Sequence, residues 1–316
     1  MRFVFVMDTL DRVSHDKDTT FAFIAAAQAR GHESWHCLPR DLWVLGGEPH
    51  ATVRRLRILE GPPWIQLDLD APARMPLAGM DAVFIRKDPP FDAAYLYATL
   101  LLEHVRDRTL ILNDPRGLRD ANEKLYAMNF PEWTPRTLVT ADREMIHEFV
   151  RDCGGKAVIK PLDGAGGAGV MQLVAGDKNA RAIADALTLE GQRLAMVQEF
   201  LPAVTEGDKR VLLLDGEILG AILRVPRGDD LRSNIHVGGS VVPTELTERE
   251  QEMVLALAPR LRADGLIFVG LDVIGERLTE VNVTSPTGIQ ELGRFTNSRP
   301  SERVIAWVET HAAKPR

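Results

Sequence analysis

The sequence is poor in cysteine, and it has no apolar segment long enough to cross a membrane. Only Cys37 and Cys153 are present among 316 residues, and so few thiols, so far apart, are typical of a reducing cytoplasm. No apolar run approaches the roughly 20 residues that a spanning helix needs. The first residues, MRFVFVMDTLD, lack the long apolar core of a signal peptide. We therefore expect a cytoplasmic protein without a membrane partner.

The chain also lacks an excess of positive charge. Its formal net charge is −7 at pH 7, which disfavours nucleic acid and anionic membranes as main partners. Local basic clusters can still bind an anionic small molecule. An apolar content of 45% and a charged content of 26% are ordinary for a globular protein. The length of 316 residues suffices for two or three modules that share a sizeable core.

Two common nucleotide-binding signatures are missing, namely GxxxxGK[ST] and a GxGxxG that follows a strand and opens a helix. The sequence has instead AVIKPLDGAGGAG at residues 157–169. A β-type run leads into Lys160, and a loop then carries glycines at positions 164, 166, 167 and 169. Glycine lets consecutive N–H groups converge on phosphate oxygens. A flexible loop between two strands remains the alternative interpretation.

Strand and helix patterns alternate in the first third of the chain. Strands are predicted at 2–7, 32–38, 82–85 and 110–113, and helices at 18–31 and 92–105. Such strand–helix–strand units predict a parallel sheet. A hairpin turning at Gly46 and Gly47 is predicted within residues 41–59. Later strands are expected at 194–200, 210–214, 218–225, 267–274 and 278–283, and later helices at 142–153, 180–190, 247–263 and 301–313.

Three oxygen-bearing side chains lie on the last predicted strand pair. Glu280 and Asn282 are two residues apart and therefore point to the same face. Asp272, on the neighbouring strand, is placed to meet them across the pair. Such oxygens suit Mg²⁺, which often completes its shell with water and phosphate oxygens. The alternative is the polar outer face of an edge hairpin.

Basic side chains form the other chemical signal. Lys124 and Lys160 precede separate modules and are placed to reach the phosphates of one nucleotide. Arginine forks suit carboxylates and phosphoryl groups. The arginines in question are Arg86, which follows the strand at 82–85, and Arg210, Arg224 and Arg232, which lie on or after the strands beside a long polar loop at 226–242. We expect this loop to close over a site, although each basic residue alone also fits a solvated surface position.

The order of these features resembles the ATP-grasp ligases and, within them, the bacterial glutathione synthetases. The matching segments are RKDPPFD at 86–92, NEKL at 122–125, KPLDG at 160–164, GDKRV at 207–211, GLIFVGLD at 265–272 and LTEVNVTSPT at 278–287. They cover roughly residues 2–295 in the order of the family. RKDPPFD and NVTSPT are not general ATP-grasp features, so they favour the narrower resemblance.

The resemblance implies an α/β protein whose ATP-binding half is α+β. It implies an N-terminal parallel-sheet (pre-ATP-grasp) domain at residues 1–122 and an ATP-grasp domain at 123–316. The second domain is expected to have a lid subdomain with the glycine loop at 123–201 and a C-terminal subdomain with the metal site at 202–316.

The resemblance also implies roles for individual residues. Those for ATP are Lys124, Lys160, Gly164, Gly166, Gly167, Gln198, Glu199, Phe200, Leu201 and Asp208. The implied metal is Mg²⁺, with Mn²⁺ as the alternative. Its implied ligands are Asp272, Glu280 and Asn282. Arg210 and Arg224 are implied to be catalytic, because they would stabilise an acyl phosphate. Those for the other substrates are Arg86, Arg232, Ser285, Pro286 and Thr287.

The activity implied is ATP-dependent ligation of γ-glutamylcysteine and glycine to glutathione, with release of ADP and phosphate. The cysteinyl carboxylate would take the γ-phosphate of ATP, and the amine of glycine would attack the resulting acyl phosphate. No side-chain nucleophile is required, in keeping with the lack of a convincing Ser–His or Cys–His pair. A homo-oligomer, dimer or tetramer, is also implied.

Two other functions remain open from the sequence. One is an ATP-grasp ligase that joins a different acid or amine, and the other is a nucleotide-binding regulatory module without catalysis. A dinucleotide-dependent oxidoreductase is poorly supported, because no strand–GxGxxG–helix unit occurs. The sequence departs from the family pattern at Ser240, where we expect an arginine after two glycines, and at residues 287–290, which lack a cysteine sometimes found there.

Overall fold

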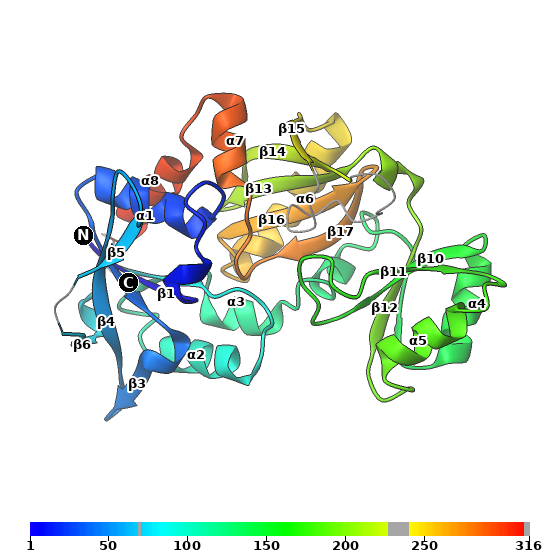
Figure 1. Ribbon diagram of the computed structural model, residues 1–316, viewed down its shortest axis with the longest axis horizontal. Helices are drawn as coiled ribbons and strands as arrows, with labels where there is room; N and C mark the ends of the chain where they lie inside the picture. Colours follow the sequence, from blue (N-terminus) through cyan, green and yellow to red (C-terminus); the bar gives the residue numbers. More distant parts are fainter. Residues whose placement is uncertain (69–70, 227–239, 313–316) are drawn as a thin grey trace.

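The computed structural model describes residues 1–68, 71–226 and 240–312, and these residues form three β-sheets with helices packed against them (Figure 1). We call them the N-terminal sheet, the small sheet and the central sheet. In Figure 1 the central sheet lies between the other two.

The N-terminal sheet has the strand order β3-β4-β2-β1-β7-β8, and β5 and β6 pair with β4. Strand β1 pairs in parallel with β2 and β7, and β7 pairs in parallel with β8, as the sequence predicts. The strands are β1 (Arg2–Met7), β2 (Glu33–Cys37), β3 (Leu42–Leu45), β4 (Glu48–Ile58), β5 (Ile65–Leu67), β6 (Ala73–Pro76), β7 (Ala82–Arg86) and β8 (Leu110–Leu112).

Alternate residues of β1 are buried on opposite faces of this sheet. Phe3 and Phe5 pack with α1 (Thr19–Ala29) and α8 (Pro300–Ala312), whereas Val4 and Val6 pack with α2 (Ala93–Glu103) and α3 (Pro115–Asp120). A strand covered on both faces reads as a continuous apolar run, which explains FVFVM. Asp18 begins α1, because its carboxylate accepts a hydrogen bond from the Phe21 N–H at 2.8 Å.

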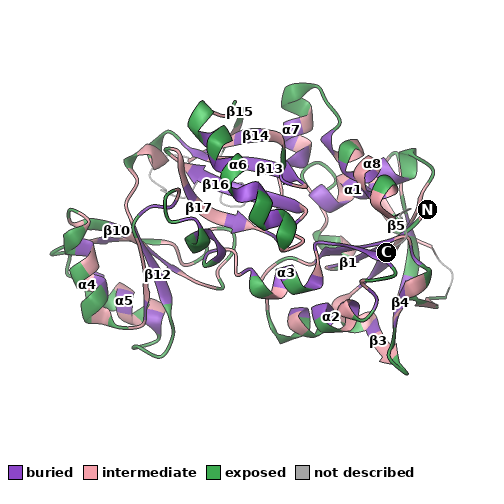
Figure 2. Ribbon diagram, turned by 180° about the vertical axis from the view of Figure 1, so that it is seen from behind, coloured by how far each residue is buried: buried purple, intermediate pink, exposed green. Residues whose placement is uncertain are grey.

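The small sheet is antiparallel and has its own hydrophobic core. Its strands are β9 (Thr137–Thr140), β10 (Lys156–Pro161), β11 (Met171–Val174) and β12 (Ala195–Glu199), in the order β11-β10-β12-β9. Ile159 and Val197 pack against Ile146 of α4 (Arg143–Asp152) and Ala184 of α5 (Ala180–Thr188). Figure 2 shows large parts of both helices as exposed, so the helices form the outer layer.

The central sheet is also antiparallel, in the order β15-β14-β13-β16-β17. Its elements are β13 (Asp208–Leu214), β14 (Glu217–Val225), β15 (Ser240–Pro243), β16 (Phe268–Ile274), β17 (Arg277–Asn282), α6 (Glu248–Ala263) and α7 (Ile289–Thr296). Val211 and Leu213 belong to the core that contains the apolar face of α6. Asp208 and Arg210 therefore point to the opposite face. A capping box formed by Thr247 and Glu250 begins α6, at the start of the helix predicted at 247–263.

Asn113 joins the N-terminal sheet to the central sheet. Its Nδ2 donates to the carbonyls of Phe268 and Val283 at 2.9 and 2.8 Å, and its Oδ1 accepts from the N–H groups of Ile267 and Phe268, both at 2.8 Å. The side chain is buried with all four bonds made. One polar residue thus fixes the register between two sheets that are distant in sequence.

Five short elements were not predicted from the sequence, namely β5, β6, α3, α7 and β15. Helix α3 has only six residues and α7 only eight, which is too short for a clear helical period. Strand β15 lies in the predicted loop at 226–242 and pairs with the edge strand β14. The remainder of that loop, at 227–239, lies outside the described residues.

Short 3₁₀ segments connect some of these elements. They are Leu10–Arg12, Pro39–Asp41, Leu77–Gly79, Tyr126–Asn129 and Pro202–Thr205. Cys37 and Cys153 are free thiols. Within residues 1–68, 71–226 and 240–312, none of the helices combines the length and the apolar character required to cross a membrane.

Candidate active site

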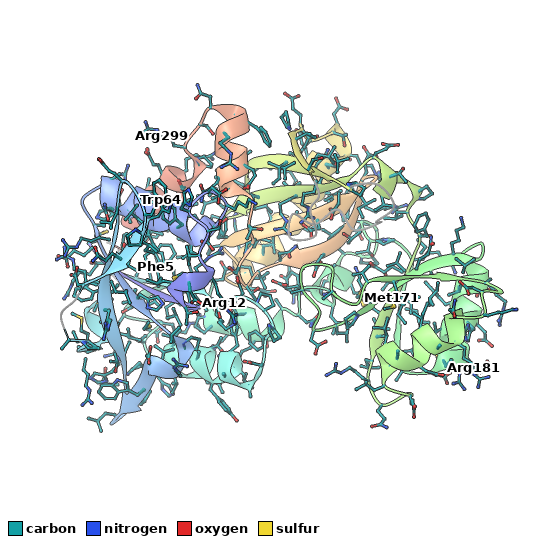
Figure 3. The ribbon with its side chains drawn as sticks, viewed as in Figure 1. Phe5, Arg12, Trp64, Met171, Arg181 and Arg299 are labelled. Carbon is teal, nitrogen blue, oxygen red and sulfur yellow. The ribbon has the colours of Figure 1, made fainter. Side chains whose placement is uncertain are left out.

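A cleft of about 1060 Å³ is lined by the small sheet, the central sheet and loops of the N-terminal module. Figure 3 labels Arg12 and Met171, which line it from the N-terminal module and from β11 and lie well apart. The predicted site residues that line this cleft are Lys124, Lys160, Gly164, Gly166, Gly167, Gln198, Glu199, Phe200, Leu201, Asp208, Arg210, Arg224, Asp272, Glu280, Asn282, Ser285, Pro286 and Thr287. The structure therefore brings most of the predicted set to one place.

A row of charged side chains crosses the cleft face of the central sheet. Strand register places Asp208 opposite Arg224, Arg210 opposite Asp272, and Asp272 opposite Glu280. Arg210 Nε and Nη2 donate to the two carboxylate oxygens of Asp272 at 2.5 and 3.1 Å. Arg224 Nη2 donates to Asp208 Oδ2 at 2.5 Å and lies 3.0 Å from Asp272 Oδ2. Cross-strand pairing thus holds two arginines on one central carboxylate.

Burial makes this network electrostatically strong. Asp272 is 5% exposed, Arg210 6% and Arg224 4%. Burial alone would raise the pKa of Asp272, but Arg210 and Arg224 outweigh it and hold that pKa well below its usual range. Burial raises the pKa of Asp208 to about 6, against the opposing effect of Arg224. Asp272 therefore remains an anion throughout the physiological range, and the arginines remain cations beside it.

The two predicted lysines meet beside this row. Lys124 Nζ donates to the Gly164 carbonyl at 2.5 Å and to Glu280 Oε1 at 3.1 Å. Lys160 Nζ donates to the Thr279 carbonyl at 3.2 Å. Both side chains are buried, and burial lowers the pKa of Lys160 to about 8, although Glu280 opposes the shift. The lysines thus place two ammonium groups where anionic oxygens of a ligand can replace their present partners.

We expect kcat/KM for ATP to fall as the pH rises through about 8, because Lys160 loses its proton there. Below that pH the ammonium group is charged and attracts phosphate, and above it the neutral amine does not. The pH profile of kcat/KM reports the free enzyme. Lys160→Arg supplies the control, because a guanidinium stays charged and should flatten the alkaline limb. A wild-type profile that stays level from about pH 7 to about pH 9 would contradict this assignment.

The glycine loop needs its first glycine for space rather than for flexibility. A Cβ at position 164 would come within 2.7 Å of Pro161 Cγ and 2.9 Å of the Ala168 carbonyl oxygen. Gly166 and Gly167 have φ values of 61° and 80°, a region that favours glycine. The loop therefore packs tightly on itself beside Lys124, and a larger residue would move its backbone.

The small sheet supplies an apolar wall. Val158 lies opposite Gln198 in the register of β10 and β12, and both line the cleft. Gln198 Nε2 donates to Thr137 Oγ1 at 3.0 Å. Met171 and Ile274 contribute apolar surface nearby and were not predicted. Val158 could have been found, because it is two residues from Lys160 and shares its face.

The predicted metal ligands all line the cleft, and their free oxygens fit a hard cation. Glu280 Oε1 accepts from Lys124, and both Asp272 oxygens accept from arginines, but a carboxylate offers about four acceptor sites. Asn282 Nδ2 donates to the Gly270 carbonyl at 3.2 Å, which leaves its amide oxygen available. No cluster of three or more His, Cys, Asp or Glu suited to a metal occurs in the described part of the chain. Two carboxylates and an amide suit Mg²⁺, which keeps water and phosphate ligands.

Arg86 lies behind the cleft wall and is not among the residues that line it. It is 6% exposed, and it donates from Nε to Thr20 Oγ1 at 3.1 Å and from Nη2 to the Pro286 carbonyl at 3.0 Å. In the structure it therefore supports the segment at 284–288. Arg232, the other predicted substrate arginine, lies outside the described residues.

The predicted acceptor segment is held from two sides. The Pro286 carbonyl accepts from Arg86, and the Thr287 carbonyl accepts from Arg210 Nη1 at 3.2 Å. A Cβ at Gly270 would lie 2.9 Å from Pro286 Cβ and 3.0 Å from Arg210 Cδ. Because position 270 is glycine, Pro286 and Arg210 can both pack closely against β16.

Glu123 is a residue of the site that was not predicted from the sequence. Its Oε1 accepts from Val283 N–H at 2.9 Å, from Thr284 N–H at 3.0 Å and from Thr284 Oγ1 at 2.8 Å. Burial raises its pKa, and the nearby Glu280 carboxylate raises it further. It fixes the end of β17 next to Lys124. The only sequence signal was its position beside that lysine.

Comparison with known proteins gives consistent results over nearly the whole chain. Residues 1–119 match the N-terminal domain of prokaryotic glutathione synthetase, and residues 123–297 match its ATP-grasp domain. A glutathione synthetase from Thermosynechococcus vestitus is 44% identical, over 98% of this chain and 99% of that protein. One from Bradyrhizobium diazoefficiens is 43% identical, over 98% of each.

Solved structures agree on the fold at much lower identity. D-cycloserine synthetase DcsG has a TM-score of 0.66 at 16% identity, over 97% of this chain and 99% of that one. The ATP-grasp ligase PsnB, complexed with minimal precursor, Mg and ADP, has a TM-score of 0.62 at 18% identity, over 99% and 98%. The predicted fold class is confirmed. By its sequence matches over both domains, the chain belongs to the prokaryotic glutathione synthetase family of ATP-grasp ligases.

Proposed function

We propose that this protein joins γ-glutamylcysteine to glycine with ATP, forming glutathione, ADP and phosphate. The observation that carries the proposal is the single cleft in which buried lysines, paired arginines and an all-oxygen donor set meet. The same activity is indicated by the relatives at 43 to 45% identity, which are named glutathione synthetases.

For ATP, the small sheet and the glycine loop form the binding side. Lys124 and Lys160 would bind the phosphates, and the loop from Gly164 would cover them with its N–H groups. The adenine would lie against Val158 and Met171, with backbone groups at Glu199 to Leu201 at its edge. Asp208 would lie near the ribose and phosphates.

For the metal, Asp272, Glu280 and Asn282 would hold Mg²⁺, with Mn²⁺ as the alternative. When bound, the cation neutralises charge on the phosphate oxygens during transfer. The carboxylates of this chain are suited to that task because Asp272 stays ionised beside two arginines. Water and phosphate oxygens would complete the coordination.

For the reaction, the arginines orient and stabilise the groups that change charge. The cysteinyl carboxylate oxygen attacks the γ-phosphorus of ATP, and the bond to the β-phosphate oxygen breaks with release of ADP. The amine of glycine then attacks the acyl carbon, loses a proton, and expels phosphate. Arg210 and Arg224 would stabilise the acyl phosphate and the oxyanion of the second step, because they are charged and desolvated before substrate arrives. Ser285, Pro286 and Thr287 would border the glycine pocket.

We expect glycine-dependent release of ADP when the protein is given ATP, Mg²⁺ and γ-glutamylcysteine, with glutathione as the product by mass analysis. The physical reason is that the acyl phosphate turns over only when an amine reaches it. ADP release that needs a different acid or amine would retain the ligase chemistry and reject the substrates. ATP binding without ADP release under any pairing would reject the enzyme in favour of a regulatory module. The implied homo-oligomer stays a prediction.

A further inference from the structure

One end of the cleft carries charged groups that the proposed reaction does not use. We call it the N-terminal corner, formed by Arg12, Ser14, Lys17, Asp18, Asp88 and Glu291, all of which line the cleft. The start of α7 holds it together. There, Gln290 Nε2 donates to the carbonyls of His15 and Asp18 at 3.1 and 2.7 Å, and Arg294 Nη1 donates to the Asp16 carbonyl at 2.8 Å.

Glu291 is the unusual member of the corner. It is 5% exposed, and its Oε1 is paired with Arg294 Nη2 at 3.1 Å. Its Oε2 is buried, and no residue within 1–68, 71–226 or 240–312 forms a hydrogen bond with it. An unpaired buried carboxylate oxygen is costly, since the group loses water and gains nothing in return. A ligand that brings a positive donor to this wall would remove that cost.

The other charges of the corner indicate what kind of ligand fits. Asp18 Oδ1 is occupied, because it caps α1 by accepting from Phe21 N–H, and burial raises the pKa of its carboxyl group. Lys17 is exposed, and no ion pair joins it to another residue of the described chain. The corner therefore combines a buried carboxylate oxygen, for which the described residues supply no donor, with the exposed ammonium group of Lys17. An α-amino-acid head group, which carries one ammonium and one carboxylate, complements both.

This chemistry fits one end of the proposed acid substrate. The cysteinyl carboxylate of γ-glutamylcysteine must reach the phosphate side, beside Asp272 and Glu280. Its γ-glutamyl residue then extends away from ATP and still carries an ammonium and a carboxylate. Glycine also has an ammonium group, but its nitrogen must become a free amine and reach the acyl carbon. The permanent ammonium of the ligand set is therefore that of the γ-glutamyl residue.

We propose that Glu291 accepts a hydrogen bond from the α-ammonium group of the γ-glutamyl residue, with Lys17 on the side of its α-carboxylate. This inference rests on the proposed function. It makes Glu291 the residue that distinguishes a γ-glutamyl acid from an acid of the same length without the amine.

The test compares γ-glutamylcysteine with N-glutaryl-cysteine, which differs only in lacking the α-amino group. For the wild type we expect kcat/KM to be roughly 10- to 100-fold higher with the amine, the size of a hydrogen bond to a charged group. In Glu291→Gln this preference should fall to within about threefold, because a neutral amide attracts ammonium only weakly. KM for ATP should be unchanged, since ATP binds at the other end.

Two control variants separate recognition from structure. Glu302→Gln removes a similar glutamate, which lies in the first turn of α8 and pairs with Arg299 at i−3 outside the cleft; it should retain the preference. Arg294→Gln removes both the partner of Glu291 and the bond to the Asp16 carbonyl, so it measures how much of the preference depends on the packing of the corner alone. If Arg294→Gln loses the preference as Glu291→Gln does, Glu291 serves the helix and the proposal fails.

The outcomes also distinguish this inference from the proposed function. If neither acid supports ADP release with glycine, the function itself fails. If γ-glutamylcysteine is a substrate but the wild type uses N-glutaryl-cysteine equally well, only the role of Glu291 fails. That comparison needs no variant, so it can overturn the proposal even if Glu291→Gln does not fold.

Discussion

Replacing Asp272 by asparagine is expected to destabilise the fold by about 3–5 kcal/mol and to remove ligase activity. The substitution keeps the shape of the side chain but leaves Arg210 and Arg224 with one buried anion fewer. Both guanidinium groups donate to or lie within 3.0 Å of Asp272 oxygens. Loss of a buried partner costs the desolvation of the charge that remains. Urea unfolding gives the stability change, and ADP release gives the activity.

The matched control is Asp185→Asn, on α5 of the small sheet. Asp185 pairs with Arg143 at 2.7 Å, but about a third of each side chain is exposed, at 30% and 32%. Water then replaces the lost interaction, so the expected cost is below about 1 kcal/mol. Equal urea midpoints for Asp272→Asn and the wild type would show that the buried row contributes nothing to stability.

Replacing Lys160 by methionine is expected to reduce activity strongly without reducing the stability of the fold. We expect kcat/KM for ATP to fall by about 100- to 1000-fold, the usual cost of removing a preorganised charge from a site. Stability should be unchanged or higher, because burial already lowers the pKa of Lys160 to about 8 and thus opposes its charge in the fold. Steady-state kinetics and urea unfolding of the same preparation measure both.

Lys156→Met is the control for the second prediction. It lies on the same strand, four residues earlier, and is exposed. Loss of its charge should change kcat/KM by no more than about twofold. It should change the free energy of unfolding by no more than about 0.5 kcal/mol. Should Lys160→Met bind and use ATP as the wild type does, the lysine would be structural and the placement of the phosphates would have to change.

Elements were predicted well from the sequence where the pattern of apolar residues was long, or where the residues that define the element lie close together in the chain. The helix predicted at 247–263 agrees with α6, and the turn predicted at Gly46 and Gly47 joins β3 to β4. Glu280 and Asn282 were predicted to share a face because a strand alternates with period two. The family and fold class followed from ordered motifs and are confirmed by the comparisons.

Pairings between strands that are distant in the chain could not be predicted from the sequence. Asp272 was predicted as a metal ligand, but nothing local showed that β13 lies beside β16 and aligns Arg210 with it. The resemblance implied a substrate role for Arg86, but its contact with the Pro286 carbonyl, 200 residues away in the chain, could not be predicted. Glu291 was missed because α7 is too short to show a period. Such long-range contacts depend on the assembled sheets.

The three hydrophobic cores of this protein can form at different times during synthesis. The core of the small sheet is drawn wholly from residues 138–197, so it can form as soon as that stretch has left the ribosome. The other two cores combine residues near position 4 with residues beyond 280. The first sheet to be made must therefore wait, with part of its apolar surface uncovered, for the last strands and for α8. The segment that emerges in the middle of translation is thus the first able to become a finished unit.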